Sequence, residues 1–266
     1  MGGSECTVID SRLVIRELGS KVVALMLCIG ALPFVNSAGA YAQKSEFTYG
    51  AQAKVQSAYL WRGLQAGGAN IQASANVGYY GMYADLWWNV GVKDATFKVF
   101  QPEVDISIGF QRWGLNIFAL YIHNFNCGFF DFGNYADKGN RLELDISYTL
   151  SDKIPLTFSW ATRVAASDGV INDKGEFVQA YSSYAQISYV QRLRDDWSIY
   201  GAIGVTPWKG VYNPDGAALQ NIEVRLRKDW TVAGRCGLML QGQLCVNPFA
   251  ATNVILTNIT FGVYLK

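Results

Sequence analysis

The sequence predicts an all-β fold: a transmembrane, antiparallel, up-and-down β-barrel of about 12 strands, with roughly 10 to 14 compatible with the pattern. Three observations carry this prediction. Apolar and polar residues alternate through most of the chain after residue 42, short and long connections follow one another in turn, and aromatic residues gather near the ends of the alternating segments. We therefore expect residues 43–266 to form one barrel domain.

Residues 1–42 are expected to be a signal peptide and not part of the fold. Arg12, Arg16 and Lys21 give a basic region, an apolar run follows over 22–35, and the Ala-Tyr-Ala at 40–42 is a small-x-small cleavage pattern. The apolar run is too short to cross a bilayer as a helix, although a retained anchor is the alternative. Export of a barrel places it in the outer membrane of a diderm bacterium.

Alternation with period two is the main signal for strands. Over 70–79 the odd positions are apolar and most even positions are polar, as in a strand with one apolar and one polar face. The pattern recurs in segments near the length of about ten residues that a tilted membrane strand needs. The expected strands are 47–62, 70–79, 82–90, 103–111, 113–121, 141–148, 156–164, 181–189, 197–205, 221–227, 232–246 and 255–265.

The connections between these segments differ in length in a regular way. Short turns at one rim and longer loops at the other are typical of outer-membrane barrels, which have both termini on the short-turn, periplasmic side and an even number of strands. The expected short turns are 78–81, 111–114, 151–155, 192–197 and 227–230. The expected long connections are 63–70, 91–102, 123–140, 166–177, 206–218 and 247–253.

Aromatic residues with the apolar parity lie near strand ends, where amphipathic rings suit the boundary between lipid and water. A soluble β-sandwich that uses the same parity for its core is the alternative. Interleaved acids and bases on the polar face favour the barrel. The expected girdle consists of Trp61, Tyr79, Trp113, Tyr121, Tyr148, Tyr189 and Trp197, with Trp61 and Tyr121 at the long-loop rim.

The charged residues of the polar face are expected to line the lumen. Opposed acidic and basic walls would orient and select small solutes, whereas charges that pair across the lumen would close it. The sequence leaves both outcomes open. The expected lumen-lining charges are Lys54, Arg62, Asp85, Glu103, Asp105, Arg141, Glu143, Asp145, Arg163, Glu223 and Arg225.

Two features bear on whether the lumen is open. Arg62 precedes Gly63, which implies a tight exit from the first strand, so we expect its guanidinium to donate to loop carbonyls; gating the mouth is the alternative. The connection 124–140 carries five aromatic residues that a free surface seldom exposes. We expect it to fold inward as a constriction, with contact to a partner protein as the alternative.

We expect no enzyme activity. A barrel that hydrolyses lipid would need a serine beside a histidine on the lipid-facing side near the outer rim. His123 is the only histidine and has outward parity near that rim, but the candidate partners Ser107 and Ser167 lack the local signature of a nucleophile.

We also expect no cofactor, no metal and no nucleic-acid partner. Residues 43–266 contain Cys127, Cys236 and Cys245, an odd number without the spacing of a metal site. If any two pair, Cys127 and Cys245 are the candidates, because the other strand cysteine is too far from Cys245. A net charge of +1 without basic clusters argues against nucleic acid.

Residues 54–91, KVQSAYLWRGLQAGGANIQASANVGYYGMYADLWWNVG, resemble the opening of the TorF-type porin family. The shared features are a strand ending in an aromatic-x-Arg-Gly element, a short glycine-containing loop and a second strand that contains glutamine. PEVDISIGF at 102–110 is similar to the acidic-x-Asp strand that follows in that family, and the match lies mainly in 54–121.

The resemblance implies a porin-like channel of the outer membrane. From the barrel and its charged polar face we expect the passive passage of small hydrophilic solutes. A plugged structural or partner-binding barrel is the alternative, and a lipid hydrolase is a weaker one. Outer-membrane lipid and those solutes are the expected partners. The segment NITFGVYLK at 258–266 resembles the terminal strand that the barrel-assembly machinery recognises during insertion, except that it ends in Lys266.

Overall fold

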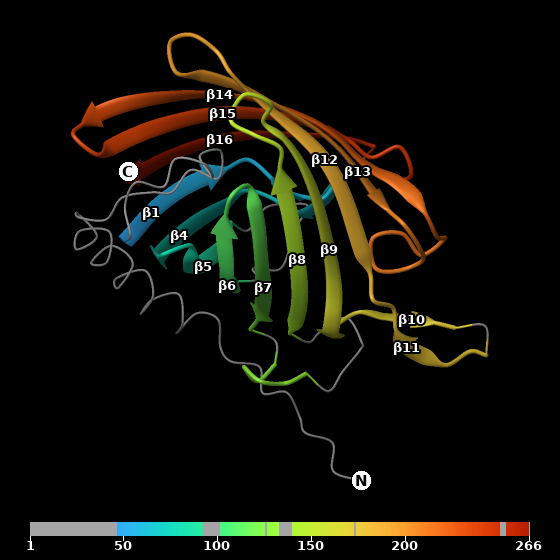
Figure 1. Cartoon of the computed structure of the whole chain (residues 1–266). Coiled ribbons are helices and arrows are strands. Elements are labelled where there is room, and N and C mark those ends of the chain that lie inside the picture. Colours follow the sequence, from blue (N-terminus) through green and yellow to red (C-terminus); the bar gives the residue numbers. More distant parts are fainter. Residues whose placement is uncertain are drawn as a thin grey trace.

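The computed structural model describes residues 47–92, 102–125, 127–132, 140–172, 174–250 and 254–265. In these ranges, twelve strands close into a barrel in the order β1-β16-β15-β14-β13-β12-β9-β8-β7-β6-β5-β4 (Figure 1). The barrel strands are β1 (Phe47–Gln56), β4 (Asn70–Tyr79), β5 (Met82–Gly91), β6 (Glu103–Arg112), β7 (Leu115–Asn124), β8 (Arg141–Thr149), β9 (Leu156–Ala166), β12 (Ser183–Arg192), β13 (Trp197–Thr206), β14 (Ala218–Ala233), β15 (Cys236–Val246) and β16 (Ile255–Leu265).

Every pairing in the barrel is antiparallel, and the first and last strands close it. Ala51 of β1 lies opposite Leu265 of β16, while Phe47 at the start of β1 lies opposite Tyr79. The start of β1 and the end of β16 therefore lie at the rim of the short turns. The predicted antiparallel up-and-down barrel is confirmed. The expected signal segment 1–42 lies outside the described residues.

The outer surface of the barrel is apolar. Along β16 the outward odd positions are exposed and the inward even positions are buried, as strict alternation requires. Other strands follow this alternation less strictly, and large apolar side chains are exposed on the outside, among them Ile108, Ile146, Ile187, Ile203, Val224, Leu240 and Ile259. A β-sandwich would bury the apolar face of each strand between two sheets. A single closed sheet turns that face outward, as a transmembrane barrel does toward lipid.

No helix in the described part of the chain has the length and hydropathy needed to cross a membrane.

Four of the five short turns lie where the alternating pattern predicts them. The turn after β4 has Tyr80 at φ 49° and Gly81 at φ 93°, and the turn after β6 has Trp113 at φ 53° and Gly114 at φ 82°. Two successive positive φ values are the mark of a two-residue turn whose twist matches that of the strands.

The turn predicted at 227–230 is wrong. β14 continues through this segment, with Arg227 opposite Gln241 and Trp230 opposite Leu238, and the chain reverses only after Ala233. Arg227 and Asp229 sit two positions apart on the same face and pair with each other at 2.7 Å. The charges that suggested a turn are therefore a pair along the inner face of one strand.

Two small hairpins interrupt the long-loop side of the barrel: β2 (Tyr59–Trp61) with β3 (Leu64–Gly67), and β10 (Gly169–Ile171) with β11 (Phe177–Gln179). The predicted continuous first strand over 47–62 is therefore wrong, because β1 ends at Gln56. The Ala58 N–H donates to the Asn258 side chain at 3.2 Å. This contact replaces the strand ladder and redirects the chain into the β2–β3 hairpin.

Candidate functional site: the lumen and the hairpin that crosses it

The structure places the expected lumen-lining charges on the inner face of the barrel or on the β2–β3 hairpin. Their register shows the shared face: Asp85 lies opposite Ser107, Glu143 opposite Arg163, and Arg225 opposite Gln243. The barrel strands carry all of them except one. These strand residues are Lys54 on β1, Asp85 on β5, Glu103 and Asp105 on β6, Arg141, Glu143 and Asp145 on β8, Arg163 on β9, and Glu223 and Arg225 on β14.

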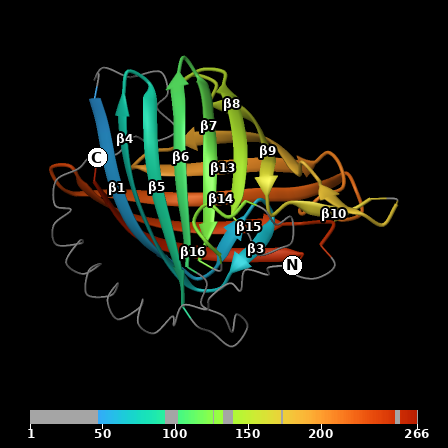
Figure 2. The same ribbon diagram turned by 90° about the horizontal axis from the view of Figure 1, so that it is seen from below.

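The β2–β3 hairpin enters the lumen and contacts several parts of its wall. On one side the Tyr59 hydroxyl donates to Glu103 at 3.1 Å, and its ring lies 5.6 Å from that of Trp87. On the other side Asn247, after β15, donates to the carbonyl of Gly63 at 3.1 Å. The hairpin therefore crosses the barrel interior from the β5–β6 wall to the β14–β15 wall (Figure 2).

The expected place of Trp61 in the outer girdle is wrong. Trp61 is on the hairpin, where its ring lies 5.8 Å from that of Tyr212, and the guanidinium of Arg163 lies 5.7 Å from its centroid. Arg163 is an inner-wall residue, so Trp61 points into the barrel. An odd or even position predicts the side of the sheet on which a side chain lies only within one continuous strand. Here β1 ends at Gln56, so the rule does not extend to Trp61.

Arg62 at the hairpin tip is fixed by two carboxylates of β8. One terminal nitrogen donates to Glu143 at 2.7 Å and the other to Asp145 at 3.1 Å, while Tyr212 adds a further hydrogen bond. The guanidinium also lies over the ring of Tyr184 at 5.2 Å. The sequence-based expectation of loop carbonyls as its partners is wrong. We refer to Arg62, Glu143, Asp145 and Tyr212 as the Arg62 latch.

Electrostatics keep Arg62 charged. Burial by itself lowers the pKa of Arg62, but Tyr212 and Glu143 outweigh burial and raise that pKa above its ordinary value. The Glu143 side chain is 1% exposed, and Arg62 offsets the negative charge of its buried carboxylate. An ion pair with one partner removed leaves a buried charge unsatisfied, so the latch holds the hairpin to β8 only while both partners are present.

The turn that follows Arg62 fits only glycine. Arg62 has φ 50° and Gly63 has φ 79°, the same backbone as the short turns of the barrel. A Cβ on Gly63 would lie 2.0 Å from the carbonyl oxygen of Gln220. The absence of a side chain therefore lets the hairpin tip rest directly on the backbone at the start of β14.

Charges of the same sign lie close together at two places on the lumen wall, although Arg141 lies near the acidic group and Glu223 pairs with Arg225 in the basic one. Asp105 interacts electrostatically with Glu103 and Asp85, all on β5 and β6. Lys54 on β1 interacts with Arg225 and Arg227 on β14. One arc of the wall is thus acidic and another basic, with the hairpin between them, and such an arrangement produces a transverse field.

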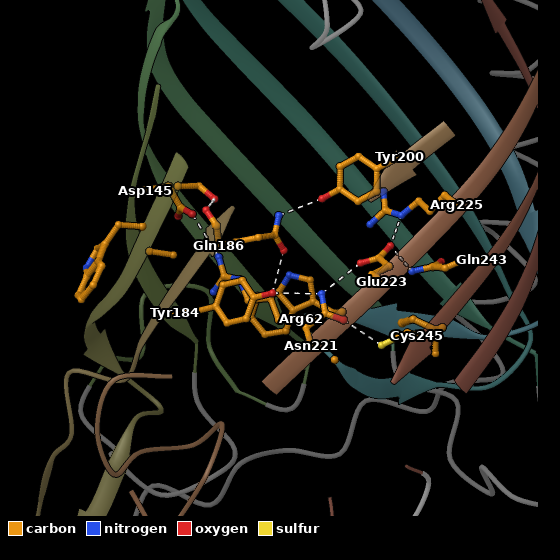
Figure 3. Close-up of a pocket in the computed structure, with 16 residues that line it drawn as sticks. Arg62, Asp145, Tyr184, Gln186, Tyr200, Asn221, Glu223, Arg225, Gln243 and Cys245 are labelled. Carbon is orange, nitrogen blue, oxygen red and sulfur yellow. Dashed lines mark hydrogen bonds and ion pairs between the residues drawn. The ribbon is translucent and has the colours of Figure 1, made fainter. Parts of the chain in front are cut away.

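A cavity of about 210 Å³ remains beside the hairpin. The hairpin tip forms part of its wall, and the inner faces of β8, β9 and β12 to β15 form the rest (Figure 3). The polar side chains that line it include Asp145, Tyr184, Gln186, Tyr200, Asn221, Glu223, Arg225 and Gln243. Packed side chains therefore do not fill the lumen completely.

The described part of segment 124–140 packs on the outside of the barrel, so the expected inward folding is wrong for these residues. Tyr121 and His123 share the outward parity of β7, and the Phe129 ring lies 5.2 Å from Tyr121 while the Phe125 ring lies 4.7 Å from His123. Phe130 is 80% exposed. In the described part of the chain, the segment that enters the lumen is the β2–β3 hairpin.

Asn140 explains why the segment lies outside. Its amide nitrogen donates to the carbonyls of Gly128, Phe129 and Asp131 at 2.9, 3.0 and 3.1 Å, and its amide oxygen lies 2.7 Å from His123 Nδ1. One buried side chain thus ties the aromatic segment to the outer face of β7. In the sequence, the only sign of this contact is the asparagine just before β8. An asparagine at that position does not indicate on which side of the barrel wall the segment lies.

The Asn140→Ala variant is expected to release the segment 125–132 without unfolding the barrel. Each buried polar group left without its partner costs about 1–3 kcal/mol, and this change affects several at once. Chymotrypsin should then cleave after Phe129 or Phe130 much faster than in the wild type, as mass spectrometry would reveal. Asn172→Ala, which loosens the β10–β11 turn through Lys174 and Glu176, is the control. Unchanged cleavage in the Asn140 variant would contradict this role.

His123 is enclosed by this segment, with 6% of its surface exposed. Ser107, one candidate partner, lies opposite Leu120 on the inner parity, whereas His123 faces outward, so the barrel wall separates them. Ser167 is buried, and its backbone N–H donates to the carbonyl of Asn140. The geometry around His123 is that of a packing residue bound to Asn140.

The cysteines of the described residues, Cys127, Cys236 and Cys245, form no disulfide there. Cys245 faces inward and donates to Asn221, while Cys127 lies with Asn140 on the outer side. Within the described ranges, no group of three or more His, Cys, Asp or Glu residues is placed to hold a metal ion.

The other expected girdle residues lie at the rims. Tyr121 is at the long-loop rim beneath Phe129. At the short-turn rim, the exposed rings are Tyr79, Trp113, Tyr148, Tyr189 and Trp197.

The chain matches no protein-family model and no curated protein. Among solved structures it is similar to the COG4313 outer membrane channel from Pseudomonas putida F1, with 9% identity and a TM-score of 0.49 over 87% of this chain and 99% of that one. It is also similar to the NanC porin (9%, 0.46, 82% and 100%) and to Salmonella typhi OmpF in complex with daunomycin (6%, 0.38, 82% and 97%). At these TM-scores the similarities support no conclusion about this chain.

The geometry itself defines the class: a closed, twelve-stranded, antiparallel β-barrel with an apolar exterior and a charged lumen that a hairpin crosses.

Proposed function

We propose that this barrel is a channel of the outer membrane of a diderm bacterium, through which small hydrophilic solutes pass passively. The observation that carries the proposal is the cavity beside the β2–β3 hairpin, which is lined by charged side chains of both signs. An apolar exterior around a polar interior with free space is the arrangement that porins use. In this proposal the hairpin is the constriction.

The charged walls supply selectivity. A solute that passes the hairpin meets the acidic arc with Asp105 and the basic arc with Lys54 and Arg225. A transverse field of this kind orients dipolar solutes and favours ions of one sign at each wall. Passage needs no covalent step, and the enclosed environment of His123 argues against lipid hydrolysis.

Lipid and the insertion machinery follow as proposed partners. The exposed apolar side chains of the strands would contact outer-membrane lipid, and the exposed rings of Trp113 and Tyr148 would lie at its periplasmic boundary. The complete alternation of β16 supports its recognition by the barrel-assembly machinery.

A plugged barrel that serves a structural or partner-binding role is the second candidate. The Arg62 latch favours it, because the hairpin is held to β8 by two carboxylates and to β14 by backbone packing. The aromatic segment with Phe130 on the outer face offers such a barrel a surface for a partner. Ion flow through the isolated protein separates the two candidates.

Refolded residues 43–266 are expected to give discrete current steps in a planar bilayer. Asp105→Asn should shift the reversal potential in a salt gradient toward anion preference, and Lys54→Gln should shift it toward cation preference, because each removes one charge of the lumen wall. Lys153→Gln, outside the lumen in the β8–β9 turn, is the matched control. A barrel that is fully folded by heat-modifiable gel migration but silent would favour the plugged alternative.

A further inference from the structure

The orientation of the Arg225 side chain is fixed by a carboxylate and an aromatic ring. Its Nε donates to Glu223, and its guanidinium lies over the Tyr200 ring at 4.5 Å. Glu223 is itself held by Gln243 at 2.8 Å and by Asn221 at 3.2 Å. The plane of the guanidinium is thus set from the side by an oriented carboxylate and from below by an aromatic ring.

The two supports of Arg225 are joined by a continuous chain of hydrogen bonds. Asn221, which donates to Glu223, also donates to the Tyr184 hydroxyl at 3.2 Å. Tyr184 donates to Gln186 at 2.8 Å, and Gln186 donates to the Tyr200 hydroxyl at 2.9 Å (Figure 3). The chain runs from the carboxylate beside Arg225 to the ring beneath it, so both are fixed by one network across β12, β13 and β14.

The terminal nitrogens of Arg225 are left available by this network. In the described part of the chain they make no hydrogen bond, and the side chain is 37% exposed in the cavity of about 210 Å³. Arg227 differs, because its Nε and one terminal nitrogen are both bonded to Asp229 at 2.8 and 2.7 Å. Arg62 likewise uses its terminal nitrogens in the latch.

We propose that the terminal nitrogens of Arg225 bind the carboxylate of a small organic acid in the lumen. This inference deepens the proposed channel function and rests on it. A planar guanidinium with two parallel N–H donors matches a planar carboxylate in a bidentate pair, which a lysine cannot form. The site therefore selects for the geometry of the anion as well as for its charge.

The surrounding charges favour a monoanion. Glu223 already offsets much of the charge of Arg225, and the neighbouring cations Lys54 and Arg227 are not among the residues that line the cavity. Hydroxyl and amide groups of Tyr184, Gln186 and Gln243 line the rest of the cavity and suit the uncharged polar part of such a solute. A phosphate dianion would require a second cation in direct contact with the fork.

The test is equilibrium binding of lactate to the detergent-solubilised barrel, followed by saturation-transfer NMR. Wild-type protein should bind lactate saturably, lactamide should not bind, and inorganic phosphate should bind more weakly than lactate. Arg225→Lys keeps the charge but removes the fork, and should weaken lactate binding by about tenfold. Tyr200→Leu, which removes the ring beneath the guanidinium, should also weaken lactate binding. The Arg227→Lys variant should leave lactate binding unchanged, because the guanidinium of Arg227 already binds Asp229.

The outcomes separate this inference from the proposed function, because binding is measured without a membrane. Equal lactate affinity in the wild type and in a folded Arg225→Lys variant would overturn the carboxylate site even if the channel conducts. Phosphate binding tighter than lactate binding would overturn the choice of carboxylate. Lactate binding that depends on Arg225 in a barrel that carries no current would support the site and overturn passive passage.

Discussion

Replacing Arg62 by alanine is expected to raise the single-channel conductance several-fold. The hairpin is the part of the described chain that crosses the lumen, and Arg62 fixes its tip to Glu143 and Asp145. Without the guanidinium, the buried Glu143 loses the cation that is hydrogen-bonded to it, and removing one partner of a buried ion pair costs about 3–5 kcal/mol. Moving the hairpin aside lets water reach that carboxylate, so the variant should favour the open lumen.

A second variant distinguishes hairpin release from general loss of structure. In Arg62→Ala combined with Glu143→Gln, the buried charge of Glu143 is also gone, and the contacts of Tyr59 with Glu103 and of Asn247 with Gly63 remain to hold the hairpin. The conductance should therefore fall back toward the wild-type value. Arg194→Ala, which removes an exposed arginine at the short-turn rim, is the control and should leave the conductance unchanged. Planar-bilayer recordings at several salt concentrations provide the measurement. Equal conductance in all four proteins would show that the hairpin does not limit the current.

Period two explains why the strands and their faces were predictable. In β16 each residue from Ile255 to Tyr264 alternates between exposed and buried, so the sequence alone assigns every side chain to lipid or lumen. The same rule placed Asp85, Glu103 and Arg225 on the inner wall. Local alternation suffices here because the barrel makes one face of each strand apolar and the other polar.

The hairpin and the outer aromatic segment were not predictable in this way, because contacts distant in sequence determine them. Arg62 and Glu143 are 81 positions apart, and the bend at Ala58 depends on Asn258, 200 positions away. Alternation continues through Tyr59 and Trp61, so the pattern gives no sign that the chain has left the wall. Likewise, the aromatic residues of 125–132 fit a lumen or an outer surface equally well until Asn140 binds their backbone.

Labelling of intact cells is expected to give an all-or-none difference between the two rims. In a variant with Cys127, Cys236 and Cys245 changed to serine, Asp215→Cys adds a thiol in the exposed long loop after β13, and Lys153→Cys adds one in the exposed turn between β8 and β9. Long loops of outer-membrane barrels face the exterior and short turns the periplasm. A membrane-impermeant maleimide should therefore label only the Asp215→Cys variant on intact cells.

Both thiols should react after the cells are lysed, which controls for accessibility. The orientation matters for the lumen because the β2–β3 hairpin and the loop with Tyr212 both lie between barrel strands on the long-loop side. If Asp215→Cys is labelled from outside, the latch lies on the side where solutes enter, and the hairpin is the first barrier that they meet. Labelling of only the Lys153→Cys variant would invert the barrel, and solutes would then pass the short-turn rim before they reach the hairpin.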